Sequence, residues 1–284
     1  MRTDFCVFIL SHGRADRVDT VHTLQRCGYT GKWYIVCDDE DSTLDEYKRI
    51  FGEEKILVFS KDEAAKMFDE MAVNPDRRVI VYARNICFKL AKQVGVRYFL
   101  ELDDDYITFQ KRYIRDDKLT GKESRELDKE FEAMIRFLEK TGCATIAFAQ
   151  GGDFIGGKEN KRLTKGLLRK AMNTFFCDAE KPFEFFGVMN EDVNAYVYWS
   201  SRGLLFFTYV WEMITQRQTQ GNAGGMTDIY LKTGTYTKTF YSVICMPSAV
   251  KVSVMGVRGR RIHHKINWEN CAPKIINERW KKSK

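Results

Sequence analysis

Three consecutive carboxylates, Asp103, Asp104 and Asp105, directly follow the apolar run 98–102. A buried strand that ends in this way concentrates negative charge at the edge of a sheet, which costs folding free energy unless a cation offsets it. Hard divalent ions such as Mg²⁺ or Mn²⁺ prefer oxygen ligands and usually bring a phosphate-bearing substrate with them. Asp103 and Asp105 therefore predict a metal–diphosphate site, whereas an isolated Asp-x-Asp is more often a solvated acidic turn.

A second acidic pair, Glu191-Asp192, lies far downstream of the triplet. A carboxylate within hydrogen-bond reach of an acceptor hydroxyl can remove its proton. The triplet could therefore bind a metal ion while this pair supplies a general base. Taken alone, however, the pair more simply indicates the start of a helix, because carboxylates favour helix N-termini.

Two adjacent histidines, His263 and His264, follow the arginines Arg258, Arg260 and Arg261. An imidazole can complete the ligand shell of an ion that carboxylate and diphosphate oxygens already hold. Nearby guanidinium groups can neutralise a leaving diphosphate. The alternative reading of this segment is a basic surface loop.

The pattern of apolar residues predicts a scaffold that brings these groups together. Strands are expected over residues 5–10, 32–37, 55–59 and 98–102, with helices up to about residue 27 and over about 44–51 and 79–94. Alternating strands and helices indicate βαβ units and a parallel, twisted sheet. Such sheets bind ligands at the carboxyl ends of their strands. Residues 11–14, 38–41 and 103–105 fall at those ends, which predicts a nucleotide cleft there.

The second half of the sequence has a different pattern. It predicts a charged helix over about 125–141, a strand over 144–149, a turn over 150–153, and strands over 204–211 and 239–246. Nothing in it resembles a linker, so we expect a single domain over residues 1–284. Within that domain, residues from 1 to about 110 would form a nucleotide-binding half, and residues from about 143 to 284 an acceptor-binding half.

The composition is that of an ordinary globular protein, with 44% hydrophobic and 30% charged residues. We expect no membrane span, because no apolar run reaches about 18 residues, and the apolar run near the N-terminus is too short for a signal peptide. The 8 cysteines are scattered without any C-x-x-C pair. This favours free buried thiols in the cytoplasm over disulfides or a zinc site.

Positive charge is concentrated near the end of the sequence. The net charge of the chain is +7, and residues 251–284 contain six Lys and four Arg against two Glu. A second basic run contains Lys158, Lys161, Arg162, Lys165, Arg169 and Lys170. Such segments are typical of a surface that binds a polyanion, although a solvated tail has the same composition.

Several common enzyme motifs are missing from the sequence. No G-x-G-x-x-G follows the first predicted strand, and no Walker P-loop, H-E-x-x-H or G-x-S-x-G occurs. Their absence argues against the usual dehydrogenases, NTPases, metalloproteases and hydrolases.

The acidic triplet after a strand, the later Glu-Asp pair and the late histidines together resemble the GT-A class of metal-dependent, nucleotide-sugar glycosyltransferases. Several segments resemble a more specific, phage-encoded family, the TET-associated glycosyltransferases. These are FILSHGRAD (8–16), YARN (82–85), ELDDDY (101–106), NEDVN (190–194), GGMTD (224–228) and IHHK (262–265). The resemblance spans most of the chain and is weakest over about 107–142. It implies an α/β fold of GT-A type, with a Rossmann-like, mostly parallel twisted sheet flanked by helices and a mixed acceptor-side half.

The resemblance also implies a reaction. A UDP-sugar would donate its sugar to a hydroxymethylated pyrimidine, typically 5-hydroxymethylcytosine, in phage DNA. Mn²⁺ or Mg²⁺ would be the cofactor, the host cytoplasm the location, and neither a membrane nor an obligate protein partner would be needed. Direct displacement at the anomeric carbon would invert its configuration.

Residue roles follow from the same likeness. Asp105 would bind the metal directly, Asp103 would contact the ribose or a metal-bound water, and His263 or His264 would complete the shell. Asp192 is the preferred base, and Glu191 would orient it. Nucleotide-sugar contacts are expected from Ser11, Arg14, Asp38, Asp39, Arg84, Asp103, Asp104, Gly151 and Gly152. The late basic residues Arg258, Arg260, Arg261 and Lys265 are expected to contact DNA.

Some alternatives stay open at this stage. The acceptor could be a glycan or a protein, and a nucleotidyltransferase with two metal ions could use the same strand-end carboxylates. A DNA-binding module with a vestigial site is a third reading. The aromatic residues 175–199 could include a platform for a base drawn out of the duplex, although most of them are expected in the core. The sequence identifies neither the sugar nor which hydroxymethylated pyrimidine would accept it.

Overall fold

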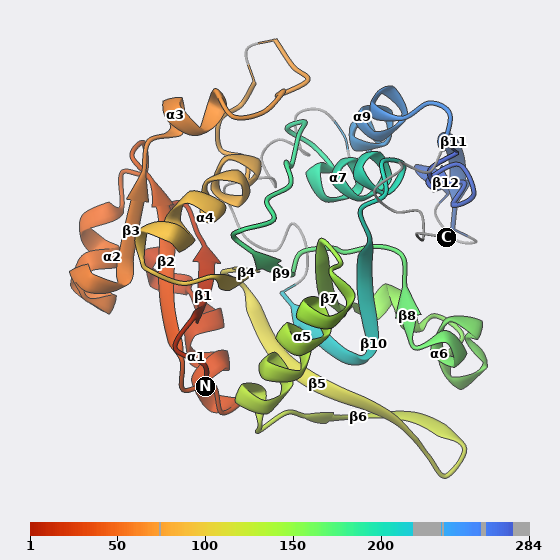
Figure 1. Cartoon of the computed structure of the whole chain (residues 1–284), viewed down its shortest axis with the longest axis horizontal. Helices are drawn as coiled ribbons and strands as arrows, with labels where there is room; N and C mark the ends of the chain where they lie inside the picture. The colour runs from red at the N-terminus through yellow and green to blue at the C-terminus, as the bar shows by residue number, and fades with distance from the viewer. Residues whose placement is uncertain (74, 218–233, 235, 257–259, 275–284) are drawn as a thin grey trace, which may run out of the picture.

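The computed structural model describes residues 1–73, 75–217, 234, 236–256 and 260–274. A ten-stranded sheet runs through it in the order β3-β2-β1-β4-β9-β7-β10-β5-β6, with β8 paired to β10, and β11 and β12 form a separate hairpin (Figure 1). The strands are β1 (Phe5–Leu10), β2 (Lys32–Asp38), β3 (Ile56–Phe59), β4 (Tyr98–Asp103), β5 (Tyr106–Arg115), β6 (Lys118–Glu123), β7 (Thr145–Ala149), β8 (Leu167–Leu168), β9 (Phe175–Asp178), β10 (Phe206–Gln216), β11 (Val250–Met255) and β12 (Arg261–Ile266).

Helices connect these strands. The α-helices are α1 (Asp19–Arg26), α2 (Leu44–Phe51), α3 (Lys61–Ala65), α4 (Val81–Gln93), α5 (Leu127–Thr141), α6 (Lys161–Lys165), α7 (Glu191–Ser200) and α9 (Thr237–Cys245). Short 3-10 helices are η1 (Ala15–Arg17), η2 (Glu53–Lys55), η3 (Gly151–Phe154) and η4 (Gly157–Glu159). No helix in the described ranges combines the length and the apolarity that crossing a membrane requires.

The first four strands of the sheet, β3-β2-β1-β4, are all parallel. Every side chain of β1 is at most 3% exposed, because layers of helices cover the sheet on both sides. Phe5, Val7 and Ile9 face one core, whereas Cys6 and Phe8 face the other. A strand that is buried on both faces has a continuous run of apolar residues, which explains why the sequence predicts β1 well. All four parallel strands end at one rim of the sheet.

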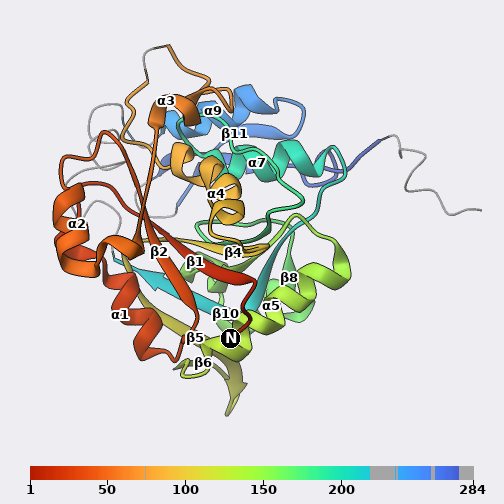
Figure 2. The same cartoon turned by 60° about the vertical axis from the view of Figure 1, so that its left-hand side comes forward.

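The two cores lie on opposite faces of the sheet (Figure 2). Helices α4 and α7 cover one face, and α1 and α5 cover the other. Beyond β4 the sheet becomes mixed: β9 runs antiparallel to β4 and to β7, and β10 is parallel to β7 but antiparallel to β5. The predicted α/β sheet with a mixed second half is therefore confirmed.

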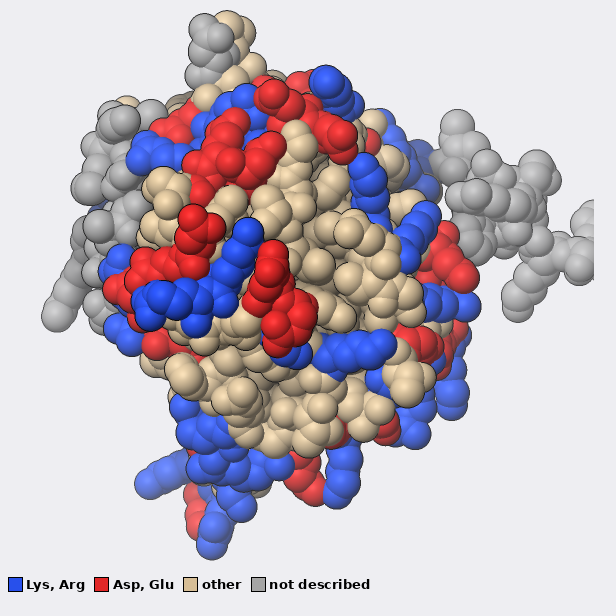
Figure 3. Space-filling model, turned by 90° about the vertical axis from the view of Figure 1, so that its left-hand side faces the viewer, with Lys and Arg blue, Asp and Glu red and all other residues tan. Residues whose placement is uncertain are grey.

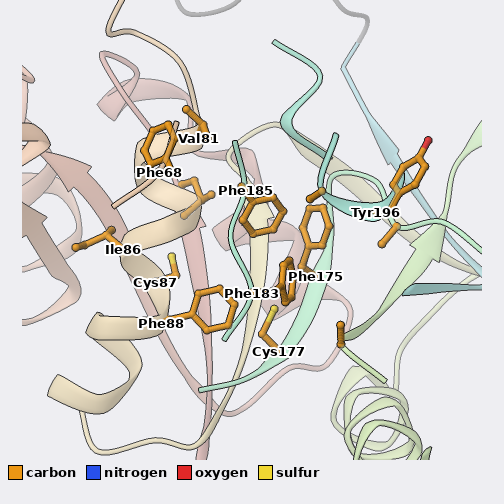
Figure 4. Close-up of a cluster of buried hydrophobic side chains, with 14 of the residues drawn as sticks. Phe68, Val81, Ile86, Cys87, Phe88, Phe175, Cys177, Phe183, Phe185 and Tyr196 are labelled. Atoms are coloured by element: carbon orange, nitrogen blue, oxygen red, sulfur yellow. The ribbon is translucent and has the colours of Figure 1, made fainter. Parts of the chain in front are cut away.

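An aromatic cluster fills the core between α4 and β9 (Figure 4). Phe183 packs edge-on against Phe88 and Phe206, and Phe175 packs edge-on against Phe185. All five rings are nearly inaccessible to solvent. Most of the aromatic residues between 175 and 199 thus belong to the core, as expected, and the buried ones cannot form a stacking platform.

The predicted strand over residues 239–246 is wrong, because this segment forms helix α9. Its β-branched and aromatic residues suggested a strand, yet the side chains that it buries are polar and three residues apart, Thr239 and Ser242. Residues three apart share one helical face. The Ser242 hydroxyl donates to Asn194 Oδ1 (3.0 Å) in α7, and this contact is not visible in a hydrophobic pattern.

Gly28 lets the end of α1 dock against the start of α5. Its φ of +84° lies in the left-handed region, and a Cβ placed there would lie 2.3 Å from the Arg125 carbonyl oxygen. The same junction contains a hydrogen bond from the Leu127 amide to the Cys27 carbonyl (3.2 Å). A side chain at position 28 would therefore force α1 and α5 apart.

We expect Gly28→Ala to lower the free energy of unfolding by about 2–5 kcal/mol, since it combines left-handed strain with a backbone clash. The matched control is Gly95→Ala, because Gly95 also has a positive φ (+72°) but a Cβ placed on it would meet no atom within 4 Å. That variant should lose only about 1–2 kcal/mol. Urea unfolding measures the free energy of unfolding of both variants. Equal losses would show that the α1–α5 junction can move apart at little cost.

Candidate active site

A cleft of about 390 Å³ opens at the rim where β1, β2 and β4 end. It is bounded on its other sides by the first turn of α4, the start of α7, and Lys238 of α9. The predicted site residues that line it are Ser11, Arg14, Asp38, Arg84, Asp103, Asp104, Asp105, Glu191 and Asp192. Residues from both halves of the sequence thus meet in one cleft.

Arg84 is the most buried charged group in this cleft, with 1% of its surface exposed. Its guanidinium donates to three carboxylates, through Nη2 to Asp103 Oδ1 (3.2 Å), Nε to Glu191 Oε1 (3.1 Å) and Nη1 to Glu101 Oε2 (3.4 Å). The ring of Phe175 lies 4.9 Å from the guanidinium carbon. Arg84 therefore links α4, β4 and α7 through a single cation.

The carboxylates around Arg84 are themselves affected by burial. Burial raises the pKa of Glu101 to about 8 and that of Asp103 to about 7, although Arg84 stabilises both charged forms. The neighbouring Asp105 and Asp104 further disfavour ionisation of Asp103. Near neutral pH the cleft therefore carries less negative charge than its number of carboxyl groups suggests.

Asp104 fixes the loop that follows β1. Its Oδ2 accepts from the Ser11 hydroxyl (2.6 Å), and its Oδ1 accepts from Arg14 Nη1 (3.1 Å). The Tyr47 hydroxyl lies 2.6 Å from the same serine oxygen and also accepts from the Arg14 amide (3.0 Å). The middle carboxylate of the triplet thus positions two of the predicted nucleotide-binding residues.

Asp105 is the member of the triplet with an uncommitted oxygen. Its Oδ1 is buried and has no hydrogen-bond partner among the described residues. Burial and the neighbouring Asp104 raise the pKa of Asp105 to about 6. A buried carboxylate oxygen without a donor is a costly arrangement unless a ligand satisfies it. Asp105 and Asp103 line the same cleft, and their oxygen donors suit Mg²⁺ or Mn²⁺.

Asp38 forms a polar corner at the end of β2. Its Oδ2 lies 2.8 Å from His12 Nδ1, and its Oδ1 lies 2.8 Å from Lys61 Nζ. Although burial opposes ionisation, these two partners keep the pKa of Asp38 below its usual value. Asp39, the other predicted residue of this strand end, is exposed, and its Oδ1 accepts from the Lys61 amide instead (2.9 Å).

Glu191 and Asp192 form the first turn of α7, so the pair does start a helix. The two side chains differ in their partners: Glu191 pairs with Arg84, whereas Asp192 Oδ1 accepts only from the Val193 amide (2.8 Å) within the described residues. Burial and the charge of Glu191 raise the pKa of Asp192 to about 6. Asp192 therefore has the accessibility to the cleft and the proton affinity that a general base needs.

The residue before this pair, Asn190, connects α7 to the C-terminal elements. Its backbone is left-handed, with φ of 55°. Its Nδ2 donates to the Lys238 carbonyl (3.0 Å) and the Ser242 hydroxyl (3.0 Å), and lies 3.3 Å from His264 Nδ1. These contacts hold the start of α7 against α9 and β12.

Several residues of the cleft were not identified from the sequence. They are His12, Lys61, Asn173, Gln216 and Lys238. His12 lies inside a motif and could have been found by its position beside Ser11. Lys238, directly before the segment predicted as a strand, had no such signal. Its ammonium lies close enough to Asp192 and Glu191 for their charges to affect its pKa, which burial lowers.

Other predicted residues do not line the cleft. Gly151 and Gly152 are exposed in η3, although the preceding Gln150 does line it. His263 and His264 lie on β12, where His263 Nδ1 contacts the His264 carbonyl oxygen (2.8 Å). Within the described ranges no group of three His, Cys, Asp or Glu side chains is arranged to hold a metal ion.

The predicted DNA contacts Arg260, Arg261 and Lys265 lie on the β11–β12 hairpin and its turn, outside the cleft. Arg258 and the motif 224–228 fall outside the residues that the structure describes.

Comparison with known sequences decides the family. The pattern described as TET-Associated Glycosyltransferase matches residues 5–225, which include the acidic triplet, the YARN motif and the Glu191-Asp192 pair. The chain belongs to the TET-associated glycosyltransferase family. This membership confirms the predicted family and the predicted activity class, glycosyl transfer. A search of curated proteins found no significant relative.

Solved structures with similar folds include other glycosyltransferases, all at low sequence identity. Glucosyl-3-phosphoglycerate synthase from Mycobacterium tuberculosis, solved with Mn²⁺ and UDP-glucose, is 10% identical, with a TM-score of 0.48 over 93% of this chain and 87% of the other. The mannosyltransferase PcManGT from Pyrobaculum calidifontis, solved with GDP-mannose and Mn²⁺, is 8% identical, with a TM-score of 0.49 over 87% and 75%. TarS 1–349 from S. aureus, solved with UDP-GlcNAc, is 12% identical, with a TM-score of 0.46 over 86% and 67%.

The Arg84 network predicts a large stability effect. Arg84→Met should lower the free energy of unfolding by about 3–5 kcal/mol, because it leaves buried carboxylates without their cation. The matched control is Arg49→Met, which removes an exposed pair between Arg49 Nη2 and Glu46 Oε1 (3.5 Å) and should cost less than about 1 kcal/mol. Chemical denaturation separates the two, and similar small losses would contradict a central role for Arg84.

Proposed function

We propose that this protein transfers a sugar from a UDP-sugar to the hydroxymethyl group of a modified pyrimidine in DNA, with 5-hydroxymethylcytosine as the preferred acceptor. One observation carries the proposal: a single cleft contains an acidic triplet with an unpartnered Asp105 oxygen and, at the start of α7, a buried Asp192 whose hydrogen bonding within the described ranges comes from a backbone amide. The first suits a metal–diphosphate group, and the second suits a base.

The donor would lie along the rim of the parallel strands. His12, Asp38 and Lys61 offer hydrogen-bonding groups at the β2 end for the nucleoside. Asp105 and Asp103 would hold Mn²⁺ or Mg²⁺, because such ions commonly bind through one or two carboxylates plus substrate phosphates. This also explains how the cleft could hold an ion although the described residues do not assemble three protein ligands. When bound, the ion would stabilise the departing diphosphate.

The acceptor hydroxyl would approach from the side of α7. Asp192 would take the proton from the hydroxymethyl oxygen as that oxygen forms a bond to the anomeric carbon. The bond between the anomeric carbon and the diphosphate oxygen breaks in the same displacement, and UDP leaves with the electron pair. A direct displacement of this kind inverts the anomeric configuration. Glu191 would hold the start of α7 through Arg84 rather than exchange a proton.

Two observations support a DNA acceptor. The family takes its name from an association with TET, and the resemblance of the motifs implies hydroxymethylated DNA as the substrate. The net charge of +8 over residues 251–284 suits a polyanion.

Free thiols, which the structure shows for all eight cysteines, would suit the reducing cytoplasm in which phage DNA is modified.

Asp105→Ala is expected to abolish the Mn²⁺-dependent part of UDP binding. Loss of an outer-shell partner costs about 10- to 100-fold in metal affinity, so loss of a direct ligand should exceed about 100-fold. Calorimetric titration of UDP with and without Mn²⁺ measures the effect. Asp128→Ala is the control, because Asp128 accepts from the Thr30 hydroxyl outside the cleft. Unchanged binding in Asp105→Ala would refute the metal role.

Asp192→Asn is expected to reduce transfer by about 100- to 10,000-fold, the usual contribution of a general base, while UDP binding stays intact. Mass spectrometry of hydroxymethylated DNA, incubated with a panel of UDP-sugars and Mn²⁺, measures transfer and identifies both the sugar and the acceptor base. Release of pyrophosphate instead of UDP would point to a nucleotidyltransferase.

Glu191→Gln provides the comparison for this variant, since it preserves the shape of the pair and should retain more activity than Asp192→Asn. The pH profile gives a second measurement. Because burial raises the pKa of Asp192 to about 6, its basic form is lost below that pH, and kcat/KM should fall about tenfold per pH unit there. If Glu191→Gln were the inactive variant, the base assignment would be reversed.

A further inference from the structure

The β11–β12 hairpin has two chemically different faces. In its antiparallel register Lys251 lies opposite Lys265, Ser253 opposite His263, and Met255 opposite Arg261. Alternate residues of a strand share a face, so these six side chains form one surface, the cationic face. The other face contains Val250, which is buried, and α9 packs against both strands of the hairpin.

The charges of this face are not balanced by acidic neighbours. From residue 250 to 266 the sequence contains no Asp or Glu. Lys251, Arg261 and Lys265 are exposed and form no ion pair with any residue that the structure describes. Like charges directly opposite each other in an antiparallel pair are destabilising. The pair Lys251–Lys265 therefore costs stability in the isolated protein, and a bound anion would remove that cost.

Two other charged parts of the surface contain both positive and negative groups. The protruding β5–β6 hairpin also pairs two cations, Arg115 and Lys118, across its strands, but Asp116 lies 3.5 Å from the Arg115 guanidinium and Asp117 pairs with Lys158. On the side of the molecule that carries α2 and α3, Lys and Arg side chains are interspersed with Asp and Glu (Figure 3). The unbalanced cationic face thus differs from these two parts of the surface.

The β11–β12 hairpin adjoins the cleft through the face opposite to its cationic face, which includes His264. His264 of β12 lies 3.3 Å from the side chain of Asn190, which lines the cleft directly before the proposed base. Burial lowers the pKa of Lys238, another residue that lines the cleft, and the positive charge of Arg261 lowers it further. The hairpin therefore stands beside the start of α7 and α9, on the side from which the acceptor would approach.

We propose that Lys251, Arg261 and Lys265 on the cationic face of the β11–β12 hairpin bind the phosphates of the DNA strand whose hydroxymethylated base enters the cleft. This inference rests on the proposed DNA acceptor. Phosphate contacts fix the position of a protein on DNA without reading sequence, and a two-stranded ribbon is narrow enough to enter the major groove. The hairpin would hold the strand while the base leaves the stack to reach Asp192.

The test variant is Lys251→Gln/Arg261→Gln/Lys265→Gln. We expect the KM for hydroxymethylated duplex DNA to rise about 10- to 100-fold at low salt, with little change in kcat at saturating DNA. The slope of log affinity against log salt should fall by about three, one for each lost phosphate contact. Fluorescence anisotropy with labelled duplexes measures this slope, and UDP affinity in Mn²⁺ checks that the variant is folded.

The matched control is Arg115→Gln/Lys118→Gln/Lys122→Gln, which removes the same charge from the β5–β6 hairpin and should leave DNA binding within about twofold of the unmodified protein. A second readout is stability: Lys251→Gln/Lys265→Gln should unfold at the same or a higher temperature, because it removes a repulsive pair. A lower unfolding temperature would contradict the unbalanced pair on which the inference is based.

The outcomes separate this inference from the proposed function. If the protein modifies DNA but the triple variant keeps its KM and salt slope, the hairpin is not the docking surface and the proposed function stands. If the protein neither binds nor modifies DNA at low salt, the proposed function fails, and the docking inference fails with it. Preferential binding of the hairpin to phosphatidylserine vesicles over duplex DNA would also overturn it.

Discussion

The ion cluster around Arg84 is the interaction on which the rest of the site depends. Helix α4, the next strand β4 and the distant helix α7 each place a group in one largely buried cluster. An isolated charge there would be very unfavourable, and removing one partner of such a cluster is costly. Phe175 and the surrounding aromatic core exclude water from it, which strengthens the attraction between the charges that remain. The spacing between the end of β4 and the start of α7 is therefore set by a buried cation and not by loops.

The carboxyl groups of the cleft divide according to their partners. Asp104 is held by a hydroxyl and Glu191 by a guanidinium, and such groups have little capacity left for a ligand. Asp105 and Asp192 retain weaker local bonding, and burial makes each of them a better proton acceptor than an exposed aspartate. Identical side chains thus acquire different roles through their surroundings. The same fold uses one carboxylate to build the cleft and leaves its neighbour available for chemistry.

The sequence predicts the parallel half of the fold well and the remaining half less well. Apolar runs such as 5–10 and 98–102 are buried on both sides, so their composition alone identifies them, and the acidic residues after them fall at the rim as expected. Helix α9 was missed because the side chains that it buries completely, Thr239 and Ser242, are polar. Lys238 was missed because no local pattern in the sequence marks it as a residue of the cleft. The pairing of Arg84 with Glu191 depends on contacts between residues 107 positions apart, which no local pattern records. The histidines illustrate the converse error. A motif suggested His263 and His264 as metal ligands, but the structure places them against Asn190 and each other.

The contacts of Asn190 bear on where the smallest autonomous catalytic unit ends. The family pattern stops at residue 225, yet the side chain that supports the left-handed backbone before Glu191-Asp192 is held by Lys238, Ser242 and His264. A non-glycine residue in that conformation is retained only when its surroundings enforce it. Helix α9 and the β11–β12 hairpin are therefore not an appendage to the matched segment. They form the brace that gives the first turn of α7 its direction, so the boundary of the working enzyme lies beyond the boundary of the recognisable family.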